Sequence, residues 1–255
     1  MYVVHCGGEV RCAKVYKEAD RRGFRSHAQY QEGRKVRGSR QARAMEKSTR
    51  YGRAEAEAAW QSAEVDALFR LSDAGVRVPR PYSFVDGVLL MELVTGADGD
   101  VAPRLDDVRL TPEQALAFHR TLIDQVVRML CAGLIHGDLS EYNVLVDKDG
   151  PVVIDLPQAV DAAGNNNAPR LFARDVDKLA AYFGRYAPQL KATDYAKEIW
   201  ALYQAGALTT DSVLTGRYTQ QEHTADVAGV LREIDAAREE AAARQQGRID
   251  AEAGL

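Results

Sequence analysis

Alternating apolar and polar residues open the chain and predict a small antiparallel β-sheet. Residues 2–6 form a first strand, a Gly-Gly pair makes the turn, and residues 9–16 return as a second strand. A second hairpin, around an Asp-Gly turn, joins residues 82–85 to residues 87–94. Its second strand contains the run VLLMELV, and so apolar a run is typical of a strand buried within a sheet.

A long helical pattern lies between the two hairpins, over residues 53–74. Four residues spaced at i, i+4, i+8 and i+11 share one face of it: Trp60, Glu64, Leu68 and Leu71. A carboxylate on an apolar face is costly to bury alone, so we expect Glu64 to meet a cation. Lys14, within the apolar second strand, is the candidate partner. The alternative for Lys14 is an edge position that faces water.

The second half of the chain is predicted to be mainly helical. Thr111 is expected to cap a helix that runs to Cys131, since Pro follows it and Gln stands three positions on. Further helices are predicted at residues 170–186, 193–204 and 224–245. Asp175 precedes an apolar helical face, and we interpret it as a first-turn acid favoured by the helix dipole.

The candidate chemistry is concentrated in residues 134–155. An apolar entry leads into His-Gly-Asp, ending at Asp138, and Asn143 follows five positions later. A hairpin with an Asp-Gly turn then leads to Asp155, so Asp138, Asn143 and Asp155 can converge at one edge of it. Carboxylate and amide oxygens suit a hard cation such as Mg²⁺, which relies on substrate phosphates for its other ligands. The alternative is a hairpin whose acidic residues serve turn chemistry alone.

Two motifs in this stretch, HGDLSEYN and IDLPQAVD, resemble the RIO family of atypical protein kinases, most closely its type 1 and bacterial members. The resemblance extends from Tyr2 to the helix at residues 170–186. It implies an α+β, bilobal protein-kinase-like (RIO) fold, with a small β-rich N-lobe and a mostly helical C-lobe. We expect the N-lobe to span residues 1–94 and the C-lobe residues 95–255.

The resemblance implies a serine/threonine protein kinase that transfers the ATP γ-phosphate to a Ser hydroxyl with Mg²⁺, or with Mn²⁺ as an alternative. It assigns Lys14, set by Glu64, to the α- and β-phosphates. Asp138 would orient or deprotonate the hydroxyl, while Asn143 and Asp155 would hold the metal. The implied contacts to adenine at the hinge come from Met91, Glu92 and Val94.

The resemblance also implies autophosphorylation, and ATP hydrolysis in which Asp155 is a transient phosphoryl acceptor. Gly137 stands where ordinary protein kinases have the arginine that reads a phosphorylated activation loop, and a short segment follows Asp155. We therefore expect no activation-loop switch. His136 is interpreted as a hydrogen-bonded core histidine. The family's phosphate-covering loop precedes the strand that begins here at Tyr2, so we expect an N-lobe without its first strand and this loop.

Charge is unevenly spread along a chain whose net charge is −4. Residues 18–53 hold eleven Lys and Arg against four Asp and Glu, mostly in a predicted flexible loop over residues 18–52. This segment fits a contact with RNA or the ribosome as well as it fits a solvated loop. Three cysteines without metal spacing favour the cytoplasm, and the absence of an 18-residue apolar run argues against a membrane span.

Two other classes of function stay open at this point. One is a small-molecule phosphotransferase of the aminoglycoside or choline kinase type, which shares a similar motif but differs at the Ser-Glu-Tyr before Asn143 and at Leu156. The other is a catalytically weak ribosome- or RNA-binding module that uses the basic segment. Neither composition nor spacing names the physiological substrate.

Overall fold

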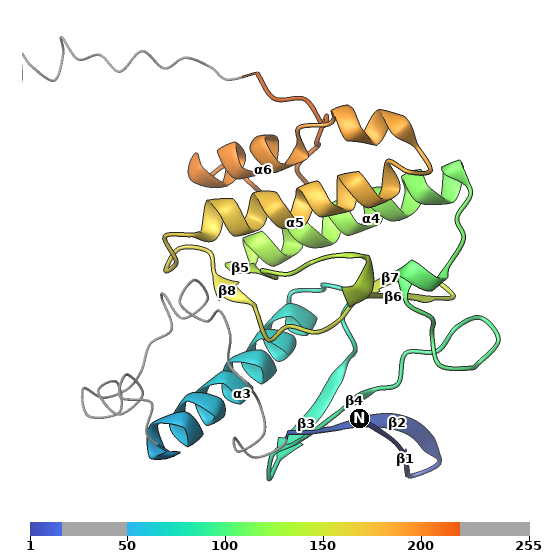
Figure 1. Cartoon of the computed structure of the whole chain (residues 1–255), viewed down its shortest axis with the longest axis vertical. Helices are drawn as coiled ribbons and strands as arrows, with labels where there is room; N and C mark the ends of the chain where they lie inside the picture. Colours follow the sequence, from blue (N-terminus) through green and yellow to red (C-terminus); the bar gives the residue numbers. More distant parts are fainter. Residues whose placement is uncertain (17–49, 220–255) are drawn as a thin grey trace, which may run out of the picture. The chain divides into compact units, whose positions relative to one another are not determined.

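The N-terminal strands form one antiparallel sheet with the order β1-β2-β4-β3 (Figure 1). The strands are β1 (Tyr2–Cys6), β2 (Glu9–Val15), β3 (Pro81–Val85) and β4 (Val88–Glu92). These bounds come from a computed structural model, which describes residues 1–16 and 50–219, with the backbone alone for residues 50–60. Lys14 lies opposite Leu89, so the lysine stands in the interior of the sheet between β1 and the apolar β4. Both predicted hairpins are confirmed.

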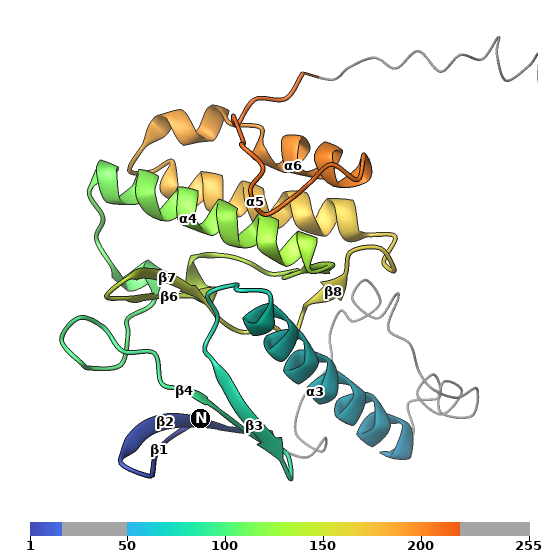
Figure 2. The same cartoon turned by 180° about the vertical axis from the view of Figure 1, so that it is seen from behind.

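Helix α3 (Arg50–Asp73) packs beside β3 and ends at the expected place (Figures 1 and 2). Gly75 follows with a φ of 73°, a left-handed conformation that glycine adopts without strain. Leu68 and Leu71 are buried in the main core, and Glu64 lies on the same buried face. The one-face pattern is therefore confirmed for these three residues.

Three helices form the other half of the compact unit Met1–Tyr218. They are α4 (Pro112–Cys131), α5 (Ala168–Phe183) and α6 (Tyr195–Gln204), and the two longer ones lie side by side (Figure 2). Thr111 caps α4 as expected, because its hydroxyl accepts from the Gln114 amide and the Gln114 side chain accepts from the Thr111 amide. Leu122, Leu179 and Phe183 are fully buried between these helices.

Short strands and turns connect the sheet to the helices and carry the candidate chemistry. Strands β5 (Leu134–Ile135) and β8 (Val160–Asp161) pair with each other, as do β6 (Val144–Asp147) and β7 (Gly150–Val153). Single helical turns occur at Leu105–Asp107, Glu141–Asn143 and Pro188–Ala192. The β6–β7 hairpin lies between the sheet and helix α4 in both views, so it borders the two halves of the fold (Figures 1 and 2).

One sequence interpretation is wrong, and several expectations are untested. Asp175 is not a first-turn residue, because α5 already begins at Ala168 and places Asp175 in its middle. The predicted loop over residues 18–52 falls almost wholly, and the helix at 224–245 wholly, outside the described residues. In the part of the chain that the structure does describe, no helix combines the length and apolar character needed to cross a membrane.

We predict that Thr111→Ala lowers the free energy of unfolding by about 1 kcal/mol, because the first turn of α4 loses its capping hydroxyl. Urea denaturation followed by circular dichroism measures the change. Thr121→Ala is the matched control, since that hydroxyl bonds the Ala117 carbonyl inside the same helix. An effect at Thr111 no larger than at Thr121 would contradict the capping role.

Candidate functional site

The loop after β5 is held from inside by a buried histidine. His136 is 1% exposed, and its Nε2 lies 3.0 Å from the Ile154 carbonyl oxygen. The Asp138 amide donates to Nδ1 of the ring at 3.3 Å, so Nδ1 is the acceptor and Nε2 carries the proton. Burial lowers the pKa of His136, which keeps the ring neutral. The interpretation of His136 as a hydrogen-bonded core histidine is confirmed.

Asp175 holds the same loop from the side of helix α5. Its carboxylate accepts the Gly137 amide at 2.7 Å and the Leu139 amide at 3.1 Å, one on each oxygen. The side chain is almost fully buried, and this burial raises the pKa of Asp175 to about 7, against the opposing effect of its backbone donors. Two amides flanking Asp138 are thus fixed by one carboxyl group.

Asn143 and Asp155 are placed by the hairpin between them. The Asn143 side-chain amide donates to the Asp138 carbonyl at 2.9 Å, and the Asn143 carbonyl accepts from the Ile154 amide at 3.0 Å. Asp155 has a φ of 65°, an uncommon conformation for a residue other than glycine, of the kind that gathers at functional sites. Its side chain is half exposed, with oxygens open to a ligand.

Lys14 joins the sheet, helix α3 and the hairpin at one point. Its ammonium group forms an ion pair with Glu64, and it lies 3.7 Å from Oδ1 of Asp155. Glu64 is only 6% exposed, so the ammonium supplies the partner that the buried carboxylate needs. The expected contact between Lys14 and Glu64 is present, and a third predicted residue, Asp155, joins it. Their roles toward a ligand stay predictions.

A cavity of about 300 Å³ opens beside this ion pair. Its size falls at the lower end of the range of small-molecule sites. The polar and apolar walls come from distant parts of the chain, and the predicted residues on them are Lys14, Glu64, Met91, Glu92, Val94, Asn143 and Asp155. Asp138 does not line this cavity; it reaches the site through its backbone contact with Asn143.

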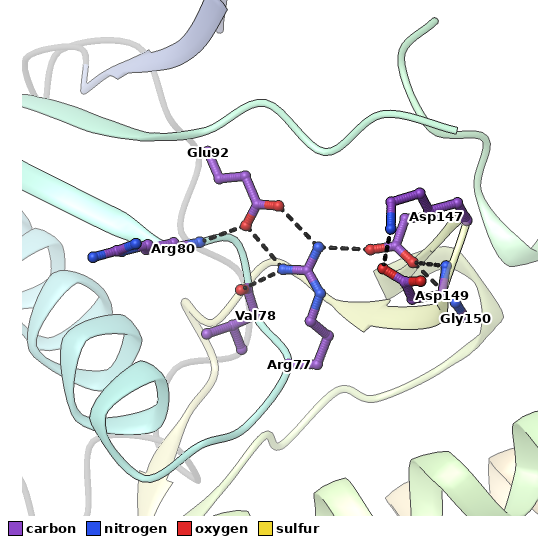
Figure 3. A network of polar contacts seen from close by, with 8 residues as sticks. Arg77, Val78, Arg80, Glu92, Asp147, Asp149 and Gly150 are labelled. Atoms are coloured by element: carbon purple, nitrogen blue, oxygen red, sulfur yellow. Dashed lines mark hydrogen bonds and ion pairs between the residues drawn. The ribbon is translucent and has the colours of Figure 1, made fainter. Parts of the chain in front are cut away.

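The carboxylate of Glu92 is engaged in an ion-pair network beside the cavity (Figure 3). Arg77 donates to both of its oxygens, at 2.8 and 2.9 Å, and to Oδ2 of Asp147 at 2.6 Å. The other Asp147 oxygen accepts the Asp149 and Gly150 amides of the β6–β7 turn. Arg77 therefore ties the end of β4 to the hairpin that carries Asn143.

The electrostatics of this network favour its charged form. Burial alone would raise the pKa of both Glu92 and Asp147, but the hydrogen bonds from Arg77 and from backbone amides outweigh it and lower both values. The Arg77 backbone is held as well, because its amide donates to the Gln125 side chain at 2.7 Å and its carbonyl accepts from Val153 at 2.9 Å.

Sequence reasoning missed three basic residues that contact the loop after β5. Lys178 donates to Oδ1 of Asp138 at 2.9 Å, Arg174 donates to the Gly137 carbonyl, and Arg185 donates to Glu141 at 3.2 Å. Arg174 and Lys178 are one helical turn apart on α5, flanking Asp175. That spacing predicts that the two basic side chains lie on one face of the helix. It does not show which loop this face contacts.

The donor set fits a metal that needs few protein ligands. No group of three or more His, Cys, Asp or Glu side chains with metal-binding geometry occurs among the described residues. Asn143 and Asp155 supply one amide and one carboxylate oxygen donor beside Lys14. Mg²⁺ commonly binds through one or two such groups together with substrate phosphates, whereas structural zinc sites are closed by four.

The fold and these motifs define a protein-kinase-like domain of the RIO class, and comparison with known proteins agrees. A sequence model of the RIO domain matches residues 2–197, so the chain belongs to the RIO domain family. It has the α+β, bilobal kinase-like fold that this family implies.

Curated relatives carry matching names. The RIO-type serine/threonine-protein kinase Rio1 of Haloferax volcanii is 42% identical over 127 residues, which cover 50% of this chain and 42% of the relative. Rio1 of Thermoplasma acidophilum is 30% identical over 142 residues, covering 54% of this chain and 73% of the relative. A probable RIO1 homolog of Encephalitozoon cuniculi is 32% identical over 146 residues, 55% of this chain and 36% of the relative. The matched part is thus less than half of the first and third relatives.

We predict that Arg77→Met lowers the free energy of unfolding by about 1–3 kcal/mol, because Glu92 and Asp147 lose their shared donor. Thermal or urea unfolding measures it. Arg80→Met is the matched control on the same connector, where the exposed guanidinium lies over the Tyr82 ring, 5.8 Å from its centroid. Equal effects of the two substitutions would contradict a structural role for the network.

A second prediction concerns pH. The folded-state pKa of Asp175, about 7, lies above its unfolded value near 3.9, so its contribution to stability is complete at low pH and is lost as pH rises toward 7. The stability advantage of the wild type over Asp175→Asn should therefore shrink between about pH 4 and pH 7. Urea titrations at several pH values measure it. A stability advantage over Asp175→Asn that grows with pH would contradict this prediction. Asp177→Asn is the control at an exposed position of the same helix, and an equal stability advantage over that variant would also contradict the prediction.

Proposed function

We propose that this domain is an ATP- and Mg²⁺-dependent serine/threonine protein kinase of the RIO type. The observation that carries the proposal is the meeting of Lys14 with both Glu64 and Asp155 at the wall of the cavity. A cation held by a buried carboxylate, beside an exposed carboxylate oxygen, suits a polyphosphate rather than an uncharged ligand.

Each part of the nucleotide is assigned to residues of the cavity. Lys14 binds the α- and β-phosphates, and Glu64 keeps its ammonium group in place. Met91 lies against the adenine ring, and the hinge backbone from Glu92 to Val94 recognises its edge. The Val94 carbonyl already accepts from the Ala102 amide at 3.0 Å, so we assign the Val94 N–H group to adenine. Ile154 and Leu145 supply an apolar wall.

The catalytic loop supplies the groups for phosphoryl transfer. Asn143 and Asp155 are the residues that would hold Mg²⁺, which would neutralise phosphate charge when bound. Asp138 orients the accepting Ser hydroxyl and receives its proton as the oxygen–phosphorus bond forms. The relatives are named as protein kinases, which favours a protein hydroxyl over a small molecule as acceptor.

The same residues allow a related outcome, in which the domain hydrolyses ATP. Asp155 would then accept the phosphoryl group transiently and release it to water. The contact of Lys14 with Asp155 supports this variant, because an adjacent cation stabilises negative charge at that carboxylate. Contact with RNA or the ribosome through residues 18–53, and a cytoplasmic location, stay predictions; almost all of that segment falls outside the described residues.

Substitution at three positions tests the proposal. We expect Asp138→Asn, Asp155→Asn and Lys14→Met each to lower ATP turnover and autophosphorylation by about 100-fold or more, because each removes a charge used in transfer. Labelled ATP followed by chromatography of ADP, phosphate and phosphoprotein measures both. Asp149→Asn is the matched control at an exposed turn and should act as wild type. Wild-type turnover in either aspartate variant would overturn the assignment.

A further inference from the structure

Lys178 contacts the group that is proposed to accept the substrate proton. Its ammonium nitrogen lies 2.9 Å from Oδ1 of Asp138. The lysine side chain is 37% exposed and the aspartate side chain 50% exposed, so the pair faces the open side of the loop. The two residues are 40 positions apart in the sequence, so the contact joins distant segments of the chain.

The position of Lys178 is set by the same helix that fixes the loop. Asp175 anchors the Gly137 and Leu139 amides, and Lys178 stands three residues later on α5, on the same face of the helix. Helix α5 therefore fixes both the backbone around Asp138 and the position from which the Lys178 side chain reaches the Asp138 carboxylate. This arrangement places the ammonium group beside Asp138.

Stability does not account for this contact. Pairs this exposed contribute about 0–1 kcal/mol, because water screens the charges and the lysine loses conformational entropy. The catalytic loop itself, from Asp138 to Asn143, contains no Lys or Arg. Without Lys178, a phosphoryl group brought to Asp138 would meet an unneutralised carboxylate, and two negative charges at such short range repel each other.

We propose that Lys178 is a phosphate-binding residue for the transferred group. It neutralises Asp138 in the resting site and donates hydrogen bonds to phosphoryl oxygens during transfer. An ammonium group suits both tasks, because it has three donors on a flexible stem and can contact a carboxylate and a phosphoryl oxygen together. This inference rests on the proposed kinase function and adds to it a residue from outside the motifs.

The bonding changes in the step balance without a further reactant. The acceptor hydroxyl oxygen bonds to the γ-phosphorus, and its proton passes to Asp138. The bond from the γ-phosphorus to the bridging oxygen breaks, and its electron pair leaves with ADP. Lys178 stays protonated throughout and stabilises charge that is spread over the phosphoryl oxygens.

Transition-state analogue binding separates this role from a structural one. Affinity for ADP with Mg²⁺ is compared in the absence and presence of aluminium fluoride, which mimics the phosphoryl group in transfer. Lys178→Gln should leave affinity for ADP within about threefold and weaken the aluminium fluoride complex by about 10- to 100-fold. Lys197→Gln is the matched control, since Lys197 pairs with Asp194 at 2.7 Å on the exposed surface of α6.

Turnover supplies the second readout. Lys178→Ala should lower kcat by about 100-fold with little change in KM for ATP, and added ethylamine should restore part of the rate. Wild-type kcat and analogue affinity in Lys178→Ala, with Asp138→Asn inactive, would overturn the role of Lys178 alone. Full turnover in Asp138→Asn would instead overturn the proposed function on which the inference rests.

Discussion

The geometry of the candidate site depends on one buried carboxyl group. Asp175 accepts the two amides that flank Asp138, so the backbone of the loop after β5 is fixed by helix α5. His136, within the same loop, also bonds the Ile154 carbonyl. Because Ile154 also bonds the Asn143 carbonyl, the loop and the hairpin share one hydrogen-bond network. A change in any one of these groups would therefore alter the backbone geometry at several positions of the candidate site.

A second constraint is the low solvent exposure of Glu64. A carboxylate on the core-facing side of α3 requires a cation, and the cation must come from the facing sheet. Lys14 meets that requirement and also approaches Asp155. Two sets of ion pairs thus connect the small sheet to the hairpin region. One is formed by Lys14 with Glu64 and Asp155, and the other is the Arg77 network.

Local patterns predicted much of the fold because their causes are local. The Thr111 cap and the two Gly-containing hairpin turns are signals within a few residues, and they were correct. The Lys14–Glu64 contact was also predictable, since a charge on an apolar face needs a partner. The contacts of Asp175, Arg77 and Lys178 were not, because their partners lie 15 to 70 residues away, on other elements of the fold. Periodicity shows that such residues are polar but not what they meet.

The Arg77 network has a consequence for how ligands bind. In a two-lobed protein with a free hinge, a ligand must supply the free energy that selects the closed arrangement, and its apparent affinity falls accordingly. Here the end of β4 and the β6–β7 turn are already joined by a shared guanidinium group, with its peptide bonded to both α4 and β7. Contacts within the protein thus join the Glu92 wall of the cavity to the β6–β7 turn. A ligand that binds in this cavity need not supply the free energy that joins these two parts of the fold.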